Sequence, residues 1–204
     1  MNPQSQLIKT ATAMAACSRR FVGVLYGQNL ADPALIRIRL NIVGQHRAMD
    51  SKFVAHVESL RPKLEALLAM PPVKPTHLPP QMPKAGVYVL SEAGRHLYVG
   101  RSNDIRGRIG RHSRPGATHR MAAFAFRLAR EATGNLRASY KKGEGSRAGL
   151  MENPVFVGAF TSAKARICRM ELRYVEEADP VRQTLLEVYV AVVLDAKYND
   201  FDNH

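Results

Sequence analysis

The sequence predicts an α/β chain of the α+β kind, in which a small three-stranded antiparallel sheet is flanked by helices and preceded by an N-terminal helical extension. Two β-rich runs, residues 86–90 and 96–100, are separated by a short loop that contains glycine, which predicts a hairpin. Apolar and charged residues alternate over 168–174, which predicts a third strand with one buried face. Apolar residues at helical spacing supply the flanking helices.

The first 70 residues predict a helical arm. Asp32 and Pro33 have the residue types of an N-cap and a first helical position, so a helix is expected toward residue 44. Asp50 predicts the cap of a second helix to residue 60, and Pro62 either kinks that helix or starts a third one to residue 70. No pattern in this arm carries chemistry, so we expect it to pack or to mediate dimerisation.

A proline-rich segment at 71–84 predicts the boundary between the arm and a domain at 85–204. It holds six of the twelve prolines of the chain, and proline fixes φ and lacks a backbone donor. Beyond the hairpin we expect helices over 103–112 and 119–133, a glycine-rich and basic loop insertion over 134–154, and an apolar helix over 180–194.

The charge of the chain favours a polyanionic partner. The net charge is +13, and residues 101–147 hold twelve basic residues against three acids. Basic residues displace the condensed counterions of nucleic-acid phosphates, although a solvated basic surface would have the same composition. Two cysteines are too few for a disulfide framework or a zinc ribbon, and no membrane helix or targeting segment is evident, so we expect a cytoplasmic protein.

Two tyrosines are expected to lie side by side in the predicted hairpin. If a three-residue loop closes it, Ser91 faces Arg95, and counting outward puts Tyr88 opposite Tyr98. Strand tyrosines usually belong to the core. A nearby cation such as Arg101 would stabilise a phenolate, however, and would let a tyrosine act as a base.

A second pair of polar residues lies on the helix that follows. Arg108 and His112 are four residues apart, so they share a helix face and flank the buried stripe that Ile105 and Ile109 predict. Cations that lean inward indicate a site. Glu187 is the only acid between residues 180 and 194, although it lies on the least apolar row of its helix and could simply face solvent.

These elements together resemble the GIY-YIG endonuclease family. Gly86-Val87-Tyr88 resembles its GIY element and Tyr98-Val99-Gly100 its YIG element, with valine in place of isoleucine in both. The segment from Arg101 to His112, then Glu187 and Asn199, resembles the rest of the pattern. The similarity covers residues 84–203, and only the insertion at 134–154 is long for such a domain.

The resemblance implies a DNA phosphodiester hydrolase that uses one Mg²⁺ or Mn²⁺ ion. Tyr88 would act as base or orient the water with help from Tyr98, Arg108 would clamp the phosphate, His112 would assist, and Glu187 would bind the metal. Arg101 and Asn199 would support the site. Arg106 and Arg111 would contact the DNA backbone, and four loop residues are candidates for reading DNA: Arg137, Lys141, Lys142 and Arg147.

The most specific hypothesis is a restriction-type enzyme that cuts double-stranded DNA, with a homodimer as a possible assembly. The alternatives are a structure-specific repair or mobile-element nuclease and a basic nucleic-acid-binding protein on the same scaffold that does not cleave.

Overall fold

The computed structural model describes residues 50–136, 143–199 and 201. Residues 51–204 make up one compact unit, and the helix expected over 33–44 lies outside the described residues. The described elements follow one another in the order α3 (Ser51–Glu58), α4 (Leu60–Ala69), β1 (Gly86–Glu92), β2 (Arg95–Ser102), α5 (Ile105–Ser113), α6 (Ala123–Ala132), α7 (Arg147–Leu150), α8 (Pro154–Arg169), β3 (Glu171–Glu176) and α9 (Pro180–Val193).

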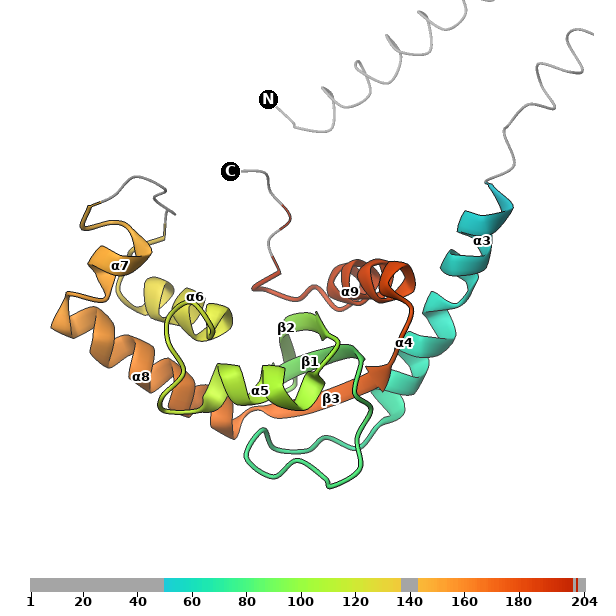
Figure 1. Ribbon diagram of the computed structural model, residues 1–204, viewed down its shortest axis with the longest axis horizontal. Helices are drawn as coiled ribbons and strands as arrows, with labels where there is room; N and C mark the ends of the chain where they lie inside the picture. The colour runs from blue at the N-terminus through green and yellow to red at the C-terminus, as the bar shows by residue number, and fades with distance from the viewer. Residues whose placement is uncertain (1–49, 137–142, 200, 202–204) are drawn as a thin grey trace, which may run out of the picture. The chain divides into compact units, whose positions relative to one another are not determined.

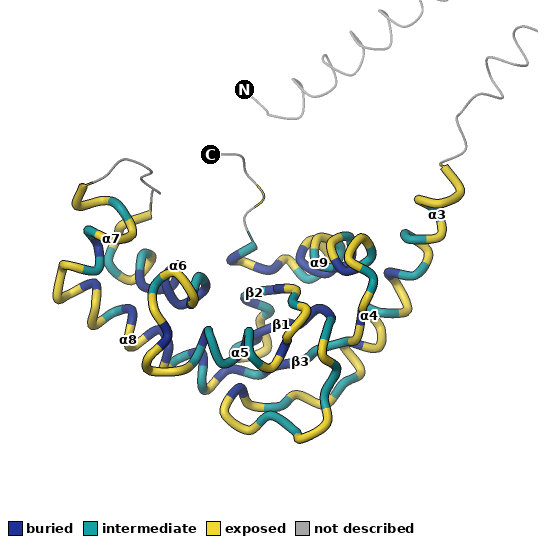
Figure 2. Tube along the Cα trace, in the orientation of Figure 1, coloured by how far each residue is buried: buried dark blue, intermediate teal, exposed yellow. Residues whose placement is uncertain are grey.

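The sheet has three antiparallel strands in the order β2-β1-β3, so the predicted fold class is confirmed. The central strand β1 is buried along almost its whole length (Figures 1 and 2). The third strand starts at Glu171, three residues later than the alternation predicted, because Cys168 and Arg169 still belong to helix α8.

The hairpin turn is shorter than expected. Ala93 and Gly94 both have positive φ, 50° and 74°, which is the backbone of a two-residue hairpin turn. Glu92 therefore pairs with Arg95, and a bulge lies between Leu90 and Ser91. The register of the outer hairpin is displaced by two residues from the one that a three-residue loop predicts.

Helix α8 was not predicted. A loop was expected up to residue 154, yet Pro154 is the first helical residue and Asn153 caps the helix by accepting from the backbone N–H of Val155 at 2.9 Å. An asparagine followed by proline is a helix start, and Phe156 and Phe160 then recur one turn apart toward the core. The start of α8 is therefore marked in the sequence by Asn153 and Pro154.

Helices cover both faces of the sheet. On one face, Val87, Val89 and Val99 pack against apolar residues of α4 and α9. On the other face, Tyr88 and Leu90 pack with residues of α5, α6 and α8. Figure 1 shows α5 crossing in front of the strands, with α9 and α4 at one end of the molecule and α6, α7 and α8 at the other.

The proline-rich segment lies inside this compact unit, although the sequence indicated a boundary there. Leu60, Leu64 and Leu67 of α4 are buried against the sheet, so α3 and α4 belong with the strands. Val73 exchanges backbone hydrogen bonds with Leu172 of β3 at 2.9 and 2.8 Å. The proline content indicated an extended segment, but the compact unit begins before it, at Ser51.

Candidate active site

The two tyrosines share a sheet face without facing each other. Tyr88 is paired with Gly100 and Tyr98 with Leu90, because the two-residue turn and the bulge between Leu90 and Ser91 each shift the register by one residue. Tyr98 is thus the diagonal neighbour of Tyr88, with ring centroids 6.3 Å apart. The expected register was wrong and the expected proximity is confirmed, since a shift of two residues keeps a side chain on the same face.

Gly100 makes room for Tyr88. A Cβ atom at position 100 would collide with the hydroxyl and ring of Tyr88, which lie directly above it. Any residue larger than glycine would push the phenol away from the strand. This close approach explains in physical terms why glycine follows Tyr98-Val99 in the sequence.

The hydroxyl of Tyr88 joins β1 to α5. It lies 2.8 Å from Nε2 of His112, and Nε of Arg108 donates to it at 3.4 Å. Tyr88 comes from β1, while His112 and Arg108 come from successive turns of α5. Tyr88 and His112 are both 0% exposed, so this cluster lies beneath the surface. The sequence placed the two α5 residues beside the core stripe, but nothing in it predicted a bond between His112 and Tyr88.

Burial sets the protonation states of this cluster. It raises the pKa of the Tyr88 phenol far above its usual 10, and Tyr98 adds to the rise while the charge of Arg108 opposes it. Burial, together with the charges of Arg108 and Arg111, lowers the pKa of His112 to about 3. At neutral pH the cluster therefore holds a protonated phenol and a neutral imidazole.

Arg108 lies over both phenols and is half-buried. Burial lowers its pKa, but its contacts with Tyr88 and Tyr98 outweigh that effect, so its pKa is raised. In this arrangement Arg108, and not Arg101, is the cation beside the Tyr88 hydroxyl. The expectation that Arg101 stabilises a phenolate is therefore corrected, because Arg101 projects from the other face of β2 with Val99.

Phe124 of α6 is a site residue that sequence reasoning left in the core. Its ring stacks on Tyr98 with centroids 4.6 Å apart and an interplanar angle of 11°. It also meets His112 edge-on at 6.3 Å. The helical spacing of Phe124 and Leu128 predicted burial, but only the structure shows that this burial holds Tyr98 in place.

Glu187 faces the protein and not open solvent. Gln183 and Ala191, one turn before and after it on α9, are 2% and 3% exposed, so the least apolar row of the helix points inward. Gln183, which belongs to this row, donates to the carbonyl of Glu177 at 2.9 Å and to Asn103 Oδ1 at 3.2 Å. It thereby fixes α9 against the loop after β2.

Arg101 forms an ion pair with Glu187. Its Nε donates to Oε2 at 2.9 Å, and the carboxylate side chain is 25% exposed. Burial raises the pKa of Glu187, and the charges of Arg101 and Arg108 only partly offset this rise. Glu187 in turn contributes to the raised pKa of Tyr88, so the carboxylate and the tyrosine cluster belong to one electrostatic environment.

Asn199 braces the site. Its Oδ1 accepts from the backbone N–H of Val99 at 2.7 Å, and its Nδ2 donates to the Val99 carbonyl at 2.8 Å. The side chain thus pairs with the outer edge of β2 as another strand would, and Tyr198 extends this pairing through Leu97. These contacts fit the supporting role that the resemblance implies for Asn199.

The predicted DNA-binding residues are scattered. Arg106 donates to the carbonyls of Pro79 and Pro80, so it ties the proline-rich segment to α5. Arg111 lies 3.8 Å from Asp104. Arg147 is exposed on α7 and far along the chain from both. Three further candidates lie outside the described residues: Arg137, Lys141 and Lys142.

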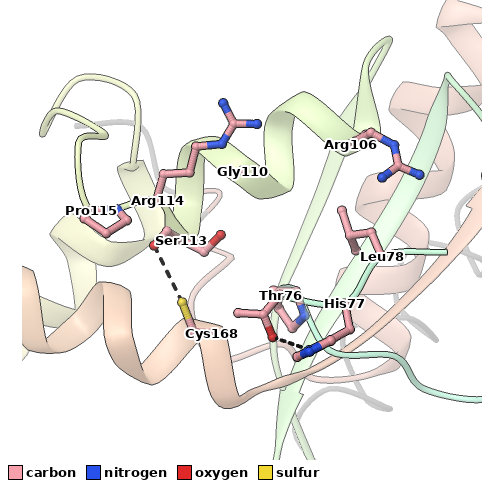
Figure 3. Close-up of a pocket in the computed structure, with 10 residues that line it drawn as sticks. Thr76, His77, Leu78, Arg106, Gly110, Ser113, Arg114, Pro115 and Cys168 are labelled. Carbon is pink, nitrogen blue, oxygen red and sulfur yellow. Dashed lines mark hydrogen bonds between the residues drawn. The ribbon is translucent and has the colours of Figure 1, made fainter. Parts of the chain in front are cut away.

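A cavity of about 450 Å³ opens between α5 and the proline-rich segment (Figure 3). Arg106 and Arg114 lie along its α5 side, while Thr76 and His77 bond to each other across from them. Neither tyrosine of the cluster nor Glu187 lines it. This hollow is therefore separate from the candidate site.

The residues present fit a single Mg²⁺ ion better than a closed metal centre. Among the described residues, no group of three His, Cys, Asp or Glu side chains could hold a metal. Mg²⁺ keeps several waters and binds through one or two carboxylates together with substrate phosphate. A partly exposed carboxylate such as Glu187 suits that mode of binding.

Within residues 50–136 and 143–199, no helix is both long and apolar enough to cross a membrane. Comparison of the chain with models of protein families, with curated proteins and with solved structures found no match.

Proposed function

We propose that this protein is a metal-dependent endonuclease that hydrolyses phosphodiester bonds of double-stranded DNA, with Mg²⁺ or Mn²⁺ as cofactor. The observation that carries the proposal is the buried hydrogen-bonded cluster of Tyr88, His112 and Arg108. Burying such groups costs stability, so their presence calls for a function. The resemblance of the sequence to GIY-YIG nucleases points to the same residues.

Arg108 is suited to bind the phosphate that is cut. Phosphoryl transfer needs cations that offset the charge of the transition state, and a guanidinium offers two parallel donors to two phosphate oxygens. Without substrate, Nε of Arg108 donates to the hydroxyl oxygen of the neutral Tyr88 phenol at 3.4 Å. A phosphate is charged and accepts stronger hydrogen bonds, so the substrate replaces the phenol as its partner.

Glu187 would hold the metal ion, with water and phosphate oxygens as further ligands. A bound Mg²⁺ supplies Lewis-acid stabilisation of the phosphoryl oxygens. Before substrate binds, Arg101 keeps the Glu187 carboxylate in a fixed position through the 2.9 Å ion pair. With the Glu187 carboxylate engaged by the ion, the Arg101 guanidinium would be available to the DNA backbone.

Tyr88 and His112 supply the proton acceptor. Arg108 donates to the Tyr88 oxygen, so the phenol hydrogen points to Nε2 of the neutral His112. Once Arg108 turns to the phosphate, water reaches the phenol oxygen. The phenol accepts the proton of this water and passes its own to His112. The water oxygen bonds to phosphorus as the bond from phosphorus to the sugar oxygen breaks. A solvent water protonates the leaving sugar oxygen, and His112 afterwards returns its proton to solvent.

Glu187→Gln tests the proposal, because it keeps the shape of the side chain and removes its charge. We expect nicking of supercoiled plasmid with Mg²⁺ to fall at least a hundredfold. The matched control is Glu65→Gln, an exposed glutamate of α4 that also pairs with an arginine, and it should cleave like the parent. Equal cleavage by the Glu187→Gln variant would rule out this site as the metal site.

A basic nucleic-acid-binding protein that does not cleave is the second candidate. The ion pair between Arg101 and Glu187 favours it, as does the full burial of Tyr88, because both close the site. DNA that is bound but never nicked, with either Mg²⁺ or Mn²⁺, would establish this function in place of the first.

The kind of nuclease follows from the cut DNA. We propose a restriction-type enzyme, for which discrete ends on linear DNA are expected, and cuts in both strands would point to a homodimer. A preference for branched over linear DNA would instead favour a structure-specific repair or mobile-element nuclease.

A further inference from the structure

Arg130 near the end of α6 and Arg147 at the start of α7 both lie beside Phe126, because Arg130 follows it one helical turn later and the guanidinium of Arg147 lies over its ring. Among the described residues, neither forms an ion pair with a carboxylate. Burial lowers the pKa of Arg130, and the charges of Arg147 and Arg127 lower it further. Carboxylate partners accompany many other arginines of the described chain, namely Arg61, Arg101, Arg111, Arg166, Arg173 and Arg182.

Glu131, the acidic residue of α6, forms its hydrogen bonds with residues other than Arg130 and Arg147. Glu131 follows Arg130 directly, yet its carboxylate accepts from Lys197 at 2.5 Å and from the hydroxyl of Tyr198. It therefore points to the C-terminal segment beside β2. The positive charge shared by Arg130 and Arg147 is left without an anion from the described part of the chain.

Each guanidinium donates one hydrogen bond to a backbone carbonyl. Nε of Arg130 donates to the carbonyl of Asn135 at 2.6 Å, while its Nη2 is buried and has no partner among the described residues. Nη1 of Arg147 donates to the carbonyl of His119 at 3.0 Å, and its guanidinium lies over the ring of Phe126 at 4.6 Å. These contacts fix the helix ends, but they use few of the five donors that each guanidinium carries.

Arg130 and Arg147 lie toward the end of α6, whereas the start of α6 contacts the candidate active site. Phe124 at the start of α6 stacks on Tyr98, and Arg130 follows six residues later. Six residues of helix span about 9 Å. One DNA strand advances roughly 3.4 Å per nucleotide along the duplex axis. Figure 1 shows α7 beside this same end of α6.

We propose that Arg130 and Arg147 together bind one phosphodiester of the DNA backbone, at a phosphate other than the one that is cut. This inference rests on the proposed nuclease function and names a second phosphate site for the same substrate. A phosphate between the two guanidiniums offsets their repulsion and accepts from both. The ring of Phe126 holds Arg147 in orientation before DNA arrives.

The test is the salt dependence of DNA binding, measured by fluorescence anisotropy of a labelled duplex in EDTA. Arg130→Gln and Arg147→Gln should each weaken binding roughly tenfold or more, as the loss of a charged hydrogen bond predicts. Because both residues hold one phosphate, the double variant should lower the slope of log K against log salt by about 0.9, the value for a single contact. A drop twice as large, or none, overturns the inference.

Two controls separate a direct contact from a folding defect. Arg61→Gln removes the same charge from an arginine that is paired with Glu65, and it should bind DNA like the parent. Arg147→Lys keeps the charge but loses the planar fork, so it should lie between the parent and Arg147→Gln. Thermal melting of each variant confirms that it is folded.

Parallel nicking assays distinguish this inference from the function on which it rests. If the parent cleaves and the glutamine variants bind DNA as tightly as it does, the phosphate site is wrong and the nuclease stands. If the variants bind weakly and the parent never cleaves, the phosphate site stands on a binding protein. A parent that does not bind DNA overturns both.

Discussion

The two faces of the sheet differ in what they bury. The core on the face toward α4 and α9 is filled by aliphatic side chains such as Leu67, Val89 and Val190, and the partly exposed ion pair of Arg101 with Glu187 lies beside it. The face toward α5 and α6 buries a phenol and an imidazole, with Arg108 half-buried above them. Strand β1 contributes to both faces through alternate residues.

This contrast separates stability from chemistry. Aliphatic burial stabilises the fold at about 25 cal/mol per Å² of apolar surface. The polar cluster gives less, because Nδ1 of His112 is buried and has no partner among the described residues. A protein selected for stability alone would fill that position with an apolar residue. We therefore expect substitutions in the polar cluster to lower cleavage, and substitutions in the aliphatic core to lower stability.

The largest effect is expected on cleavage, from Tyr88→Phe. Loss of the hydroxyl removes the proton acceptor and the partner of His112, so cleavage should fall at least a hundredfold, which corresponds to about 3 kcal/mol in the barrier. The matched control is Tyr174→Phe, since Tyr174 of β3 is paired with Tyr88 in register. Plasmid nicking by the two variants measures the difference, and equal rates would remove Tyr88 from the mechanism.

On the aliphatic face, Leu67→Ala should cost stability and spare the chemistry. Leu67 is 0% exposed, and such truncations cost about 2–5 kcal/mol. Urea unfolding should show this loss. Cleavage measured at a temperature where the variant stays folded should match the parent. A loss of activity in the folded variant would contradict the separation of the two faces.

His112 should make stability depend on pH. The unfolded chain takes up a proton on this residue below its ordinary pKa of 6.5, whereas the folded imidazole stays neutral to about pH 3. The unfolded state then binds more protons, so stability falls as the pH is lowered through this window. Between pH 7 and 5 the loss is about 2 kcal/mol. Urea unfolding of His112→Gln should lack this part of the pH dependence.

The smallest expected effect is a gain in stability, from Glu187→Gln. Burial raises the pKa of Glu187 despite the ion pair with Arg101. The folded protein therefore holds the protonated form more tightly, and the ionised form at pH 7 costs stability. Glu187→Gln should melt at a slightly higher temperature than the parent at pH 7, and the difference should vanish below pH 4.5. A variant that melts lower at pH 7 would contradict this sign.

The sequence predicted the fold well where periodicity was strong. The hairpin, α5 and α9 were found because strand alternation and helix caps are local signals. Helix α8 was missed although Asn153 and Pro154 mark its start. The hairpin register depended on the turn at Ala93 and Gly94, and a positive φ at alanine is not something that its residue type predicts.

The candidate site was predicted as a set of residues, not as a network. Helix spacing brought Arg108 and His112 to one side of α5, but their bonds to Tyr88 depend on how α5 crosses the sheet. The partner of Arg101 was assigned incorrectly, because the choice between Tyr88 and Glu187 depends on which face of β2 it occupies. Such contacts between distant segments have no local signature in a single sequence.

The most direct test of the account is to follow the oxygen that attacks phosphorus. The full-length protein is incubated with supercoiled plasmid and Mg²⁺ in ¹⁸O-labelled water, and the ends of the nicked DNA are analysed by mass spectrometry. We predict nicked DNA that carries one ¹⁸O atom in each new terminal phosphate, and none with EDTA or with the Tyr88→Phe variant. Folded protein that binds the plasmid and leaves it intact would contradict the central claim.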